Sequence, residues 1–265
     1  MKRNNKYTVI TGASSGIGYE TAKAFAKRGK NLVIIARNKV NLEKLRMEIL
    51  NDIPSVDIID KYTDLSIIKN DYQLYQELKP YKIETWINNA GFGNYEKVAN
   101  QNLEKVEIML RLNIEALVIL SSLFVHDYQN IEGSKLINIS SAGGYIIVPT
   151  AITYCASKFF VSTFTEGLAR ELQESNSKLQ AKVLAPAATK TNFGNVANNI
   201  DMYDYDKSFG SYHTSKEMAD FLLKLYDSNE VVGRISRDTF EFELTSPLFD
   251  YAGNPKHNQT VACAN

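Results

Sequence analysis

Short runs of β-branched and aliphatic residues alternate with amphipathic stretches of helical periodicity from the start of the chain to about residue 190. This alternation is typical of a parallel sheet whose strands are joined by helical crossovers. The runs are nearly continuous in hydrophobicity, as expected for strands that are buried on both faces. The expected strands are Tyr7–Ile10, Asn31–Ala36, Val56–Lys61, Thr85–Asn88, Lys135–Ser140 and Gln180–Ala185. The connecting helices are expected near residues 16–28, 39–51, 66–79, 102–128 and 153–175.

Beyond residue 190 the pattern predicts one more helix at Ser215–Ser228 and a further edge strand from Arg234–Ile235 and Phe240–Leu244. Residues 192–214 are the least regular stretch, and they follow the last clear strand. In a doubly wound sheet they would lie at the carboxyl edge, where ligands bind, so we interpret them as a substrate-covering loop. The polar tail, residues 255–265, is expected to be disordered or to dock on a neighbouring subunit. These features predict one α/β domain over residues 1–265, a doubly wound parallel sheet (Rossmann fold) with helices on both faces.

Composition excludes several classes of protein. Thirty Lys and Arg balance thirty Asp and Glu, and 44% of the residues are hydrophobic. These values argue against a disordered chain and against a protein that coats nucleic acid. The most apolar run, residues 116–125, contains Ser121 and Ser122 and is shorter than the ~20 residues that cross a bilayer. With no secretion signal before the first strand, we predict a cytoplasmic protein without a membrane partner.

The cysteines and histidines give no sign of a metal or disulfide framework. The two cysteines, Cys155 and Cys263, are far apart in the sequence and belong to no CxxC motif. The three histidines, His126, His213 and His257, are too scattered to form a ligand set by spacing. We therefore predict no metal site, and a reducing compartment.

A glycine-rich loop follows the first predicted strand. The strand runs into Thr11-Gly12-Ala13-Ser14-Ser15-Gly16-Ile17-Gly18, and a helix is expected from Tyr19. Gly12 permits a tight turn, Gly16 permits the backbone to approach a pyrophosphate, and Gly18 lets the helix pack closely on the sheet. The helix N-terminus would then present N–H groups to the phosphates. The loop predicts a dinucleotide-binding site.

The end of the second strand indicates which dinucleotide is bound. NAD-binding units usually carry an acidic residue there, which accepts hydrogen bonds from the ribose hydroxyls. Here the segment reads Ile35-Ala36-Arg37-Asn38. The guanidinium of Arg37 can bind a 2′-phosphate that an aspartate would repel, so the sequence predicts NADP(H) in preference to NAD(H).

A second group of residues can carry acid–base chemistry. Tyr154 and Lys158 are four residues apart on a predicted helix and share one face of it. An ammonium beside a tyrosine favours the phenolate and brings its pKa closer to neutrality. Ser141, at the end of a predicted strand, can direct its hydroxyl at the same substrate oxygen.

At this point the chain strongly resembles the short-chain dehydrogenase/reductase family, from about residue 6 to residue 192. Thr11–Gly18 is similar to the family's TGxxxGxG loop, Asn88–Gly91 to its NNAG segment, and Asp64 to the acid that binds the adenine. The resemblance implies catalysis by Asn113, Ser141, Tyr154 and Lys158. The predicted cofactor-binding residues are Gly12, Ser14, Ser15, Gly16, Ile17, Gly18, Arg37, Asp64, Leu65, Asn89, Ala90, Gly91, Tyr154, Lys158, Pro186, Thr189 and Thr191.

The resemblance also implies a mechanism. Tyr154 would donate a proton to the carbonyl oxygen during hydride transfer, or remove it in the reverse direction. Lys158 would hold the nicotinamide ribose and lower the pKa of the tyrosine, while Asn113 would stabilise a helix kink and a water linking Lys158 to solvent. Ser141 is chosen over Ser140 because the family commonly places its serine thirteen positions before the tyrosine.

Two positions depart from the family pattern. Ala187 replaces the glycine that usually follows Pro186, and a positive φ there would strain an alanine. Ser15 occupies a position where many NADP-using members have a basic residue, so 2′-phosphate binding would depend mostly on Arg37, with Ser14 or Asn38 helping.

Two other functions stay open beside an NADP(H)-dependent carbonyl reductase or alcohol dehydrogenase. One is a catalytically silent dinucleotide-binding regulator or scaffold, which would have no need of Tyr154. The other is a sugar-nucleotide epimerase or dehydratase, which usually needs a larger substrate domain than the residues after Thr191 can form. Aromatic residues such as Tyr203, Tyr205 and Phe209 suggest an apolar substrate pocket. The family resemblance implies a homodimer or homotetramer that acts on a small carbonyl or alcohol.

Overall fold

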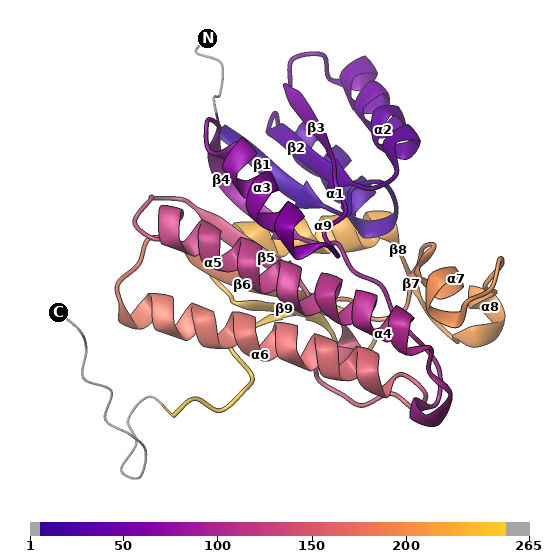
Figure 1. Cartoon of the computed structure of the whole chain (residues 1–265). Helices are drawn as coiled ribbons and strands as arrows, with labels where there is room; N and C mark the ends of the chain where they lie inside the picture. Colours follow the sequence, from indigo (N-terminus) through magenta and orange to yellow (C-terminus); the bar gives the residue numbers. More distant parts are fainter. Residues whose placement is uncertain (1–5, 253–265) are drawn as a thin grey trace.

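A computed structural model of the chain describes residues 6–252, and these form a mostly parallel sheet flanked by helices (Figure 1). Within this part of the chain, eight strands pair in the order β10-β9-β6-β5-β4-β1-β2-β3. Their bounds are β1 (Lys6–Thr11), β2 (Asn31–Ala36), β3 (Ile58–Tyr62), β4 (Lys82–Asn88), β5 (Lys135–Ile139), β6 (Gln180–Ala185), β9 (Val232–Ile235) and β10 (Phe242–Thr245). Strand order reverses between β1 and β4, so the carboxyl ends of these strands border the crevice in which such folds bind ligands. The predicted doubly wound α/β fold is confirmed.

Helices cover both faces of the sheet. One face carries α1 (Gly16–Lys27), α2 (Lys39–Asp52) and α9 (Ser215–Asp227), and the other carries α3 (Ile68–Leu78), α4 (Leu103–Leu110), α5 (Leu117–Tyr128) and α6 (Ile152–Glu174). Successive strand residues point to opposite faces. Along β1, Val9 therefore packs in the core under α3, α5 and α6, whereas Ile10 packs in the core under α1, α2 and α9. Two hydrophobic cores thus hold the loops at the carboxyl edge from both sides.

The structure corrects several predicted boundaries. β4 begins at Lys82, before the predicted Thr85, and β3 begins at Ile58, after the predicted Val56. The single predicted edge strand is instead an antiparallel pair, in which β9 also pairs with β6. The sequence pattern marked both segments, but it gave no sign that the six residues between β9 and β10 form a turn that pairs them as antiparallel neighbours.

Residues 192–214 are more regular than the sequence predicts. They contain α7 (Phe193–Asn198), α8 (Tyr205–Ser208) and β8 (His213–Thr214), which pairs with β7 (Thr189–Lys190). The side chain of Asp204 caps α8 by accepting a hydrogen bond from the backbone N–H of Lys207, at 3.1 Å. Local caps of this kind order the segment beside the carboxyl edge of the sheet. The predicted tail, residues 255–265, lies outside the described residues.

The helical stretch from Leu103 to Tyr128 is interrupted by a π-helical segment, Arg111–Ala116. By length and composition this stretch could span a membrane, since a window of 18 residues within it has a mean hydropathy of 1.9. The sequence-based estimate considered only residues 116–125 and therefore missed this length. In the fold, Leu120 and Phe124 pack in the core beside Trp86 of β4.

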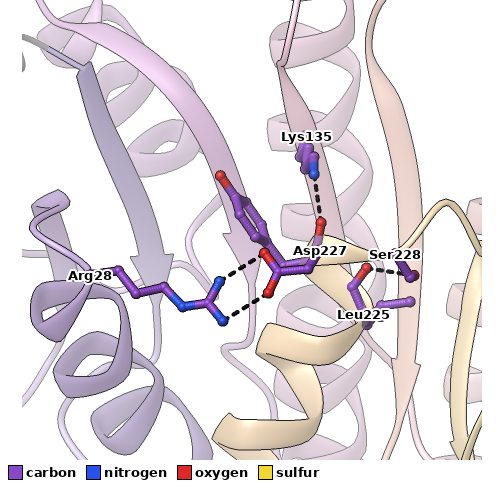
Figure 2. A network of polar contacts seen from close by, with 6 residues as sticks. Arg28, Lys135, Leu225, Asp227 and Ser228 are labelled. Atoms are coloured by element: carbon purple, nitrogen blue, oxygen red, sulfur yellow. Dashed lines mark hydrogen bonds and ion pairs between the residues drawn. The ribbon is translucent and has the colours of Figure 1, made fainter.

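A group of polar contacts ties the end of α9 to the rest of the domain (Figure 2). Both terminal nitrogens of Arg28, just after α1, donate to the carboxylate of Asp227 at 2.8 Å. Lys135, at the start of β5, donates to the backbone carbonyl of Tyr226 at 2.5 Å. Helix α9 is thereby fixed on the helix that follows the glycine loop.

Candidate active site

The glycine loop after β1 fits closely against the segment after β4. Gly12 has a φ of +67°, and a Cβ atom there would lie 2.8 Å from the Cα of Ala90. A Cβ atom on Gly18 would lie 2.5 Å from the carbonyl oxygen of Gly12. Asn89 Nδ2 donates to the carbonyl of Thr11 at 2.9 Å, and the hydroxyl of Thr11 accepts from the N–H of Ala90 at 2.9 Å. Side chains at these glycines would therefore displace the loop.

Helix α1 begins at Gly16, so the N–H groups of its first turn lie within the glycine loop. Within the described chain, the side chain of Ser15 makes no capping hydrogen bond to that turn. The first N–H groups of a helix lack partners inside the helix and carry a partial positive charge. Ser14, Ser15 and Ile17 line the adjoining cavity beside them. The loop therefore offers donors and space to an anionic group such as a diphosphate.

A cavity of about 860 Å³ runs along the carboxyl edge of the sheet and brings most of the predicted residues together. The predicted residues that line it are Gly12, Ser14, Ser15, Gly16, Ile17, Arg37, Asp64, Leu65, Asn89, Ala90, Gly91, Ser141, Tyr154, Lys158, Pro186, Thr189 and Thr191. Gly18 and Asn113 are not part of its wall. Gly18 lies beneath the loop, where the close approach of α1 requires a glycine.

Arg37 and Asp64 meet at one end of the cavity. Arg37 follows β2, its side chain is 61% exposed, and its Nη1 lies 3.4 Å from Asp64 Oδ2. Burial of Asp64 raises its pKa, but hydrogen bonds from Ser66 and the charge of Arg37 outweigh this effect and lower the pKa overall. The pair places one cation and one anion where the predicted adenosine end of a dinucleotide would lie.

Ser141, Tyr154 and Lys158 converge at the other end of the cavity. Tyr154 and Lys158 lie one turn apart near the start of α6, and both are buried. Ser141 follows β5 and forms a hydrogen bond with the side chain of Tyr154. Ser140 instead donates to the carbonyl of Lys158 at 3.0 Å and bonds to Ser162 at 2.6 Å. The geometry thus separates the two serines: Ser141 adjoins the tyrosine, whereas Ser140 fixes the helix to the sheet.

The pKa values of this group differ from the sequence-based expectation. Burial raises the pKa of Tyr154, and the hydrogen bond with Ser141 only partly offsets this rise. Burial lowers the pKa of Lys158 to about 8. The Nζ of Lys158 donates to the carbonyl of Ile139 at 2.9 Å. In this structure the environment of Tyr154 therefore favours the neutral phenol, whereas the sequence predicted a pKa lowered by Lys158.

Asn113 lies in the π-helical segment and is 1% exposed. Its Oδ1 accepts from the N–H of Phe92 at 3.1 Å, and its Nδ2 donates to the carbonyl of Phe92 at 3.0 Å and to Ser157 Oγ at 3.2 Å. A Cβ atom on Gly91 would lie 2.9 Å from Asn113 Oδ1 and 3.5 Å from Lys158 Nζ. Asn113 therefore joins the irregular helix, the segment after β4 and α6 behind the cavity wall.

Two aromatic side chains pack beside Tyr154. The ring centroid of Tyr154 lies 5.4 Å from that of Phe193 and 6.0 Å from that of Tyr95. The sequence predicted walls from Tyr203, Tyr205 and Phe209, and all three line the cavity. It missed Tyr95 and Phe193. The position of Phe193 directly after the predicted cofactor segment is the signal that could have found it.

The replacement of glycine by Ala187 causes no backbone strain. Among the described residues other than glycine, a positive φ occurs at Thr150, Asn176, Asn199 and Phe240, and thus not at Ala187. The neighbouring carbonyl of Pro186 accepts from the N–H of Ala142 at 2.7 Å. The segment after β6 therefore packs on the turn that follows Ser141 without the conformation that would require glycine.

Comparison with known proteins places this geometry in a family. The model of the short chain dehydrogenase family matches residues 6–200, which is more than half of the chain. The chain belongs to the short-chain dehydrogenase family. This confirms the resemblance on which the sequence-based assignment rested.

Three similar proteins illustrate the breadth of this oxidoreductase family. An uncharacterized oxidoreductase of Staphylococcus saprophyticus is 28% identical over 205 residues, which cover 75% of this chain and 80% of the relative. The structure of a short-chain dehydrogenase from Sphingobium yanoikuyae in complex with NADPH is 30% identical, with a TM-score of 0.77 and coverage of 86% and 87%. The bulky-bulky ketone specific alcohol dehydrogenase from Comamonas testosteroni is 27% identical, with a TM-score of 0.75 and coverage of 88% and 86%.

Proposed function

We propose that this short-chain dehydrogenase is an NADP(H)-dependent oxidoreductase that interconverts a carbonyl compound and the corresponding alcohol. The observation that carries the proposal is the single cavity that joins the glycine loop and Arg37 to Ser141, Tyr154 and Lys158. A protein that only bound a dinucleotide would have no use for a buried tyrosine, serine and lysine at the far end of that cavity. The similarity to a dehydrogenase solved with NADPH supports the same function.

The residues of the site fit a nicotinamide dinucleotide. The glycine loop leaves no room for side chains at Gly12 and Gly18, and the first turn of α1 offers N–H donors to a diphosphate. Asp64 and Leu65 would hold the adenine end, and Thr189 and Thr191 the nicotinamide end. When bound, the reduced cofactor supplies the hydride.

Arg37 supports NADP(H) over NAD(H). Its exposed guanidinium borders the cavity and can form charge-assisted hydrogen bonds with a 2′-phosphate. Asp64, which pairs with Arg37, orients the guanidinium toward the cavity end. Ser14 and Ser15 add neutral hydroxyls to this anion site, in place of a second basic residue.

The chain's own residues then carry the proton chemistry. Tyr154 is neutral because burial raises its pKa, so its hydroxyl can donate a proton to the carbonyl oxygen. Ser141 donates a hydrogen bond to the same oxygen and stabilises the negative charge that develops on it. Lys158 contributes a nearby positive charge at neutral pH, and Asn113 holds the segment after β4 against α6. In reduction, Tyr154 therefore starts in the protonated form that this step requires.

We infer that the substrate is an uncharged, largely apolar carbonyl. In the described part of the chain, the charged residues that line the cavity are Arg37, Asp64 and Lys158, all of which the proposal assigns to the cofactor or to proton transfer. The remaining wall is uncharged, and it includes aromatic and aliphatic side chains such as Phe92, Leu112 and Val148. Burial of an unpaired carboxylate against this wall would be unfavourable. A ketone with bulky apolar substituents meets these conditions.

The test is steady-state NADPH oxidation with a panel of neutral and anionic ketones. Tyr154→Phe should abolish turnover, and Ser141→Ala should lower kcat on the order of 100-fold. Ser140→Ala is the matched comparison, because it removes the neighbouring hydroxyl, which bonds to the carbonyl of Lys158 and to Ser162 and not to Tyr154, and it should lower kcat much less than Ser141→Ala. Turnover by Tyr154→Phe equal to that of the wild type would refute the proposal. NADPH binding without turnover of any ketone or alcohol would favour the silent dinucleotide-binding protein.

Several expectations stay predictions. They are the single-domain organisation of residues 1–265, the covering role of residues 192–214, the cytoplasmic location, and the homodimer or homotetramer. The exposed ring of Phe160, stacked on Phe164 along α6, supports association through this helix. Light scattering measures the oligomeric state directly.

A further inference from the structure

A buried carboxylate in the middle of α6 has no role in the proton chemistry described above. Glu166 is 2% exposed and lies on the helical ridge that carries Tyr154, Lys158 and Ser162 at intervals of four residues. In the described part of the chain it has no cationic partner within ion-pair distance. Burial of an ionised group without such compensation is unfavourable unless hydrogen bonds satisfy it. Glu166 is satisfied by three donors from two other segments.

The first donor comes from the turn that carries Ser141. Ser141 is the N-cap of the short helical turn Ala142–Gly144, and Tyr145 directly follows that turn. The hydroxyl of Tyr145 donates to Glu166 Oε1 at 2.6 Å. Glu166 therefore holds the far end of the turn at a fixed position on α6, while Ser141 holds its near end beside Tyr154.

The other two donors come from the segment Ser246–Tyr251, which follows β10 and passes along α6 (Figure 1). The backbone N–H groups of Leu248 and Phe249 donate to Glu166 Oε2 at 2.5 and 2.9 Å. The ring of Phe249 stacks on the ring of Tyr145, with a centroid distance of 5.4 Å and an interplanar angle of 15°. The segment thus contacts both the carboxylate and the tyrosine that the carboxylate holds.

We propose that Glu166 is a positioning residue that couples the segment Ser246–Tyr251 to the Ser141 turn, so that attachment of this segment sets the placement of the Ser141 hydroxyl. The proposal rests on the proposed function for the role of Ser141. The segment Ser246–Tyr251 would then be a regulatory element of the site. A ligand or subunit that detached it from α6 would lower the catalytic rate without contacting the cavity.

The chain offers a matched control on the same helix. Tyr251 donates to Glu174 Oε2 at 2.9 Å, two turns beyond Glu166, whereas Tyr145 contacts Glu166 and Phe249. Tyr251→Phe therefore removes an attachment of the same segment to the same helix without disturbing the carboxylate that holds the turn. Glu166→Ala and Phe249→Ala remove the coupling, and Glu166→Gln keeps an acceptor for the backbone N–H groups.

The first measurement is amide hydrogen exchange of residues 142–150, which needs no activity. Glu166→Ala and Phe249→Ala should speed exchange of this peptide about tenfold, whereas Tyr251→Phe should leave it unchanged and Glu166→Gln should restore most of the protection. Unchanged exchange in Glu166→Ala would overturn the proposal, and so would equal acceleration by Tyr251→Phe. Hydrogen exchange can be measured even if the wild-type protein turns over no carbonyl. Absence of turnover would refute the proposed function but not the coupling between Glu166 and the Ser141 turn.

The second measurement separates positioning from general destabilisation. Glu166→Ala and Phe249→Ala should each lower kcat for ketone reduction about tenfold, because small displacements of a catalytic group have large effects on rate. The Kd for NADPH, measured by calorimetry, should stay within about twofold of the wild type. The double variant should lose no more than either single variant, because both act through the same turn. Additive losses in kcat, or a parallel loss of NADPH affinity, would overturn the proposal.

Discussion

Replacement of Arg37 by aspartate tests the cofactor preference most directly. Arg37 lies at the end of the cavity, and its guanidinium is 3.4 Å from Asp64. Two unit charges about 4 Å apart attract by about 4 kcal/mol at an effective dielectric constant of 20. Because the side chain is 61% exposed, solvent screening reduces each such interaction to about 1 kcal/mol. Arg37→Asp removes the attraction to a 2′-phosphate and adds a repulsion, so NADPH binding should weaken by about 2 kcal/mol, or about 30-fold in Kd.

Calorimetric titration with NADPH and NADH measures this change. NADH lacks the 2′-phosphate, so its Kd should change less than about threefold, and the ratio of the NADH Kd to the NADPH Kd should fall about 30-fold. Arg46→Asp is the control, because Arg46 on α2 pairs with Asp60 at 3.5 Å and lies outside the cavity wall. It changes the net charge equally and should leave the ratio unchanged. An equal ratio in the wild type and Arg37→Asp would refute the role of Arg37.

Two further predictions concern stability and the glycine loop. Asp71 is fully buried, and burial followed by the charge of Glu115 raises its pKa from the ordinary value of 3.8 to about 7. A carboxyl whose pKa is raised by folding destabilises the native state as the pH increases through the range from about 4 to about 7. Asp71→Asn should therefore raise the free energy of unfolding by about 1–3 kcal/mol at pH 8 and by much less at pH 4. Urea unfolding at the two pH values measures this difference, and equal effects at both would contradict the reasoning. Gly18→Ala would place a Cβ atom 2.4 Å from Asn89 Nδ2, so it should weaken NADPH binding more than about tenfold. Gly167→Ala on α6 is the control and should leave NADPH binding unchanged, because no atom lies within 4 Å of its added Cβ. Equal Kd values for the two variants would show that the loop tolerates the side chain.

The predicted site residues that the structure brings together in one cavity are largely those whose placement depends on local geometry. A glycine loop between a strand and a helix, and Tyr154 and Lys158 four residues apart on a helix, are constrained by neighbours in the chain. The strand order of a doubly wound sheet then brings the ends of β1, β4 and β5 to one edge. Arg37 and Asp64 meet for the same reason, since each follows one of two adjacent parallel strands.

The parts that sequence reasoning missed depend on long-range packing. Tyr95 and Phe193 meet around Tyr154 from segments almost a hundred residues apart, and no periodicity relates them. The pKa of Tyr154 follows from its burial, which the pairing with Lys158 alone could not indicate. A glutamate within a helical pattern predicts a solvated face, yet Glu166 is buried because Tyr145 and the C-terminal segment supply its donors.

The contacts of α9 limit how the protein can be divided. The stretch shared with the family model ends at residue 200, before α9, β9 and β10 begin. Leu222 and Leu225 of α9 belong to the same core as Phe25 of α1, and the ion pair between Arg28 and Asp227 joins the ends of the two helices. A fragment cut at residue 200 would expose the back of the helix that begins at the glycine loop. We therefore expect a fragment of residues 6–200 to fold less stably than the whole chain, because the helix that begins at the glycine loop would lose its packing against α9.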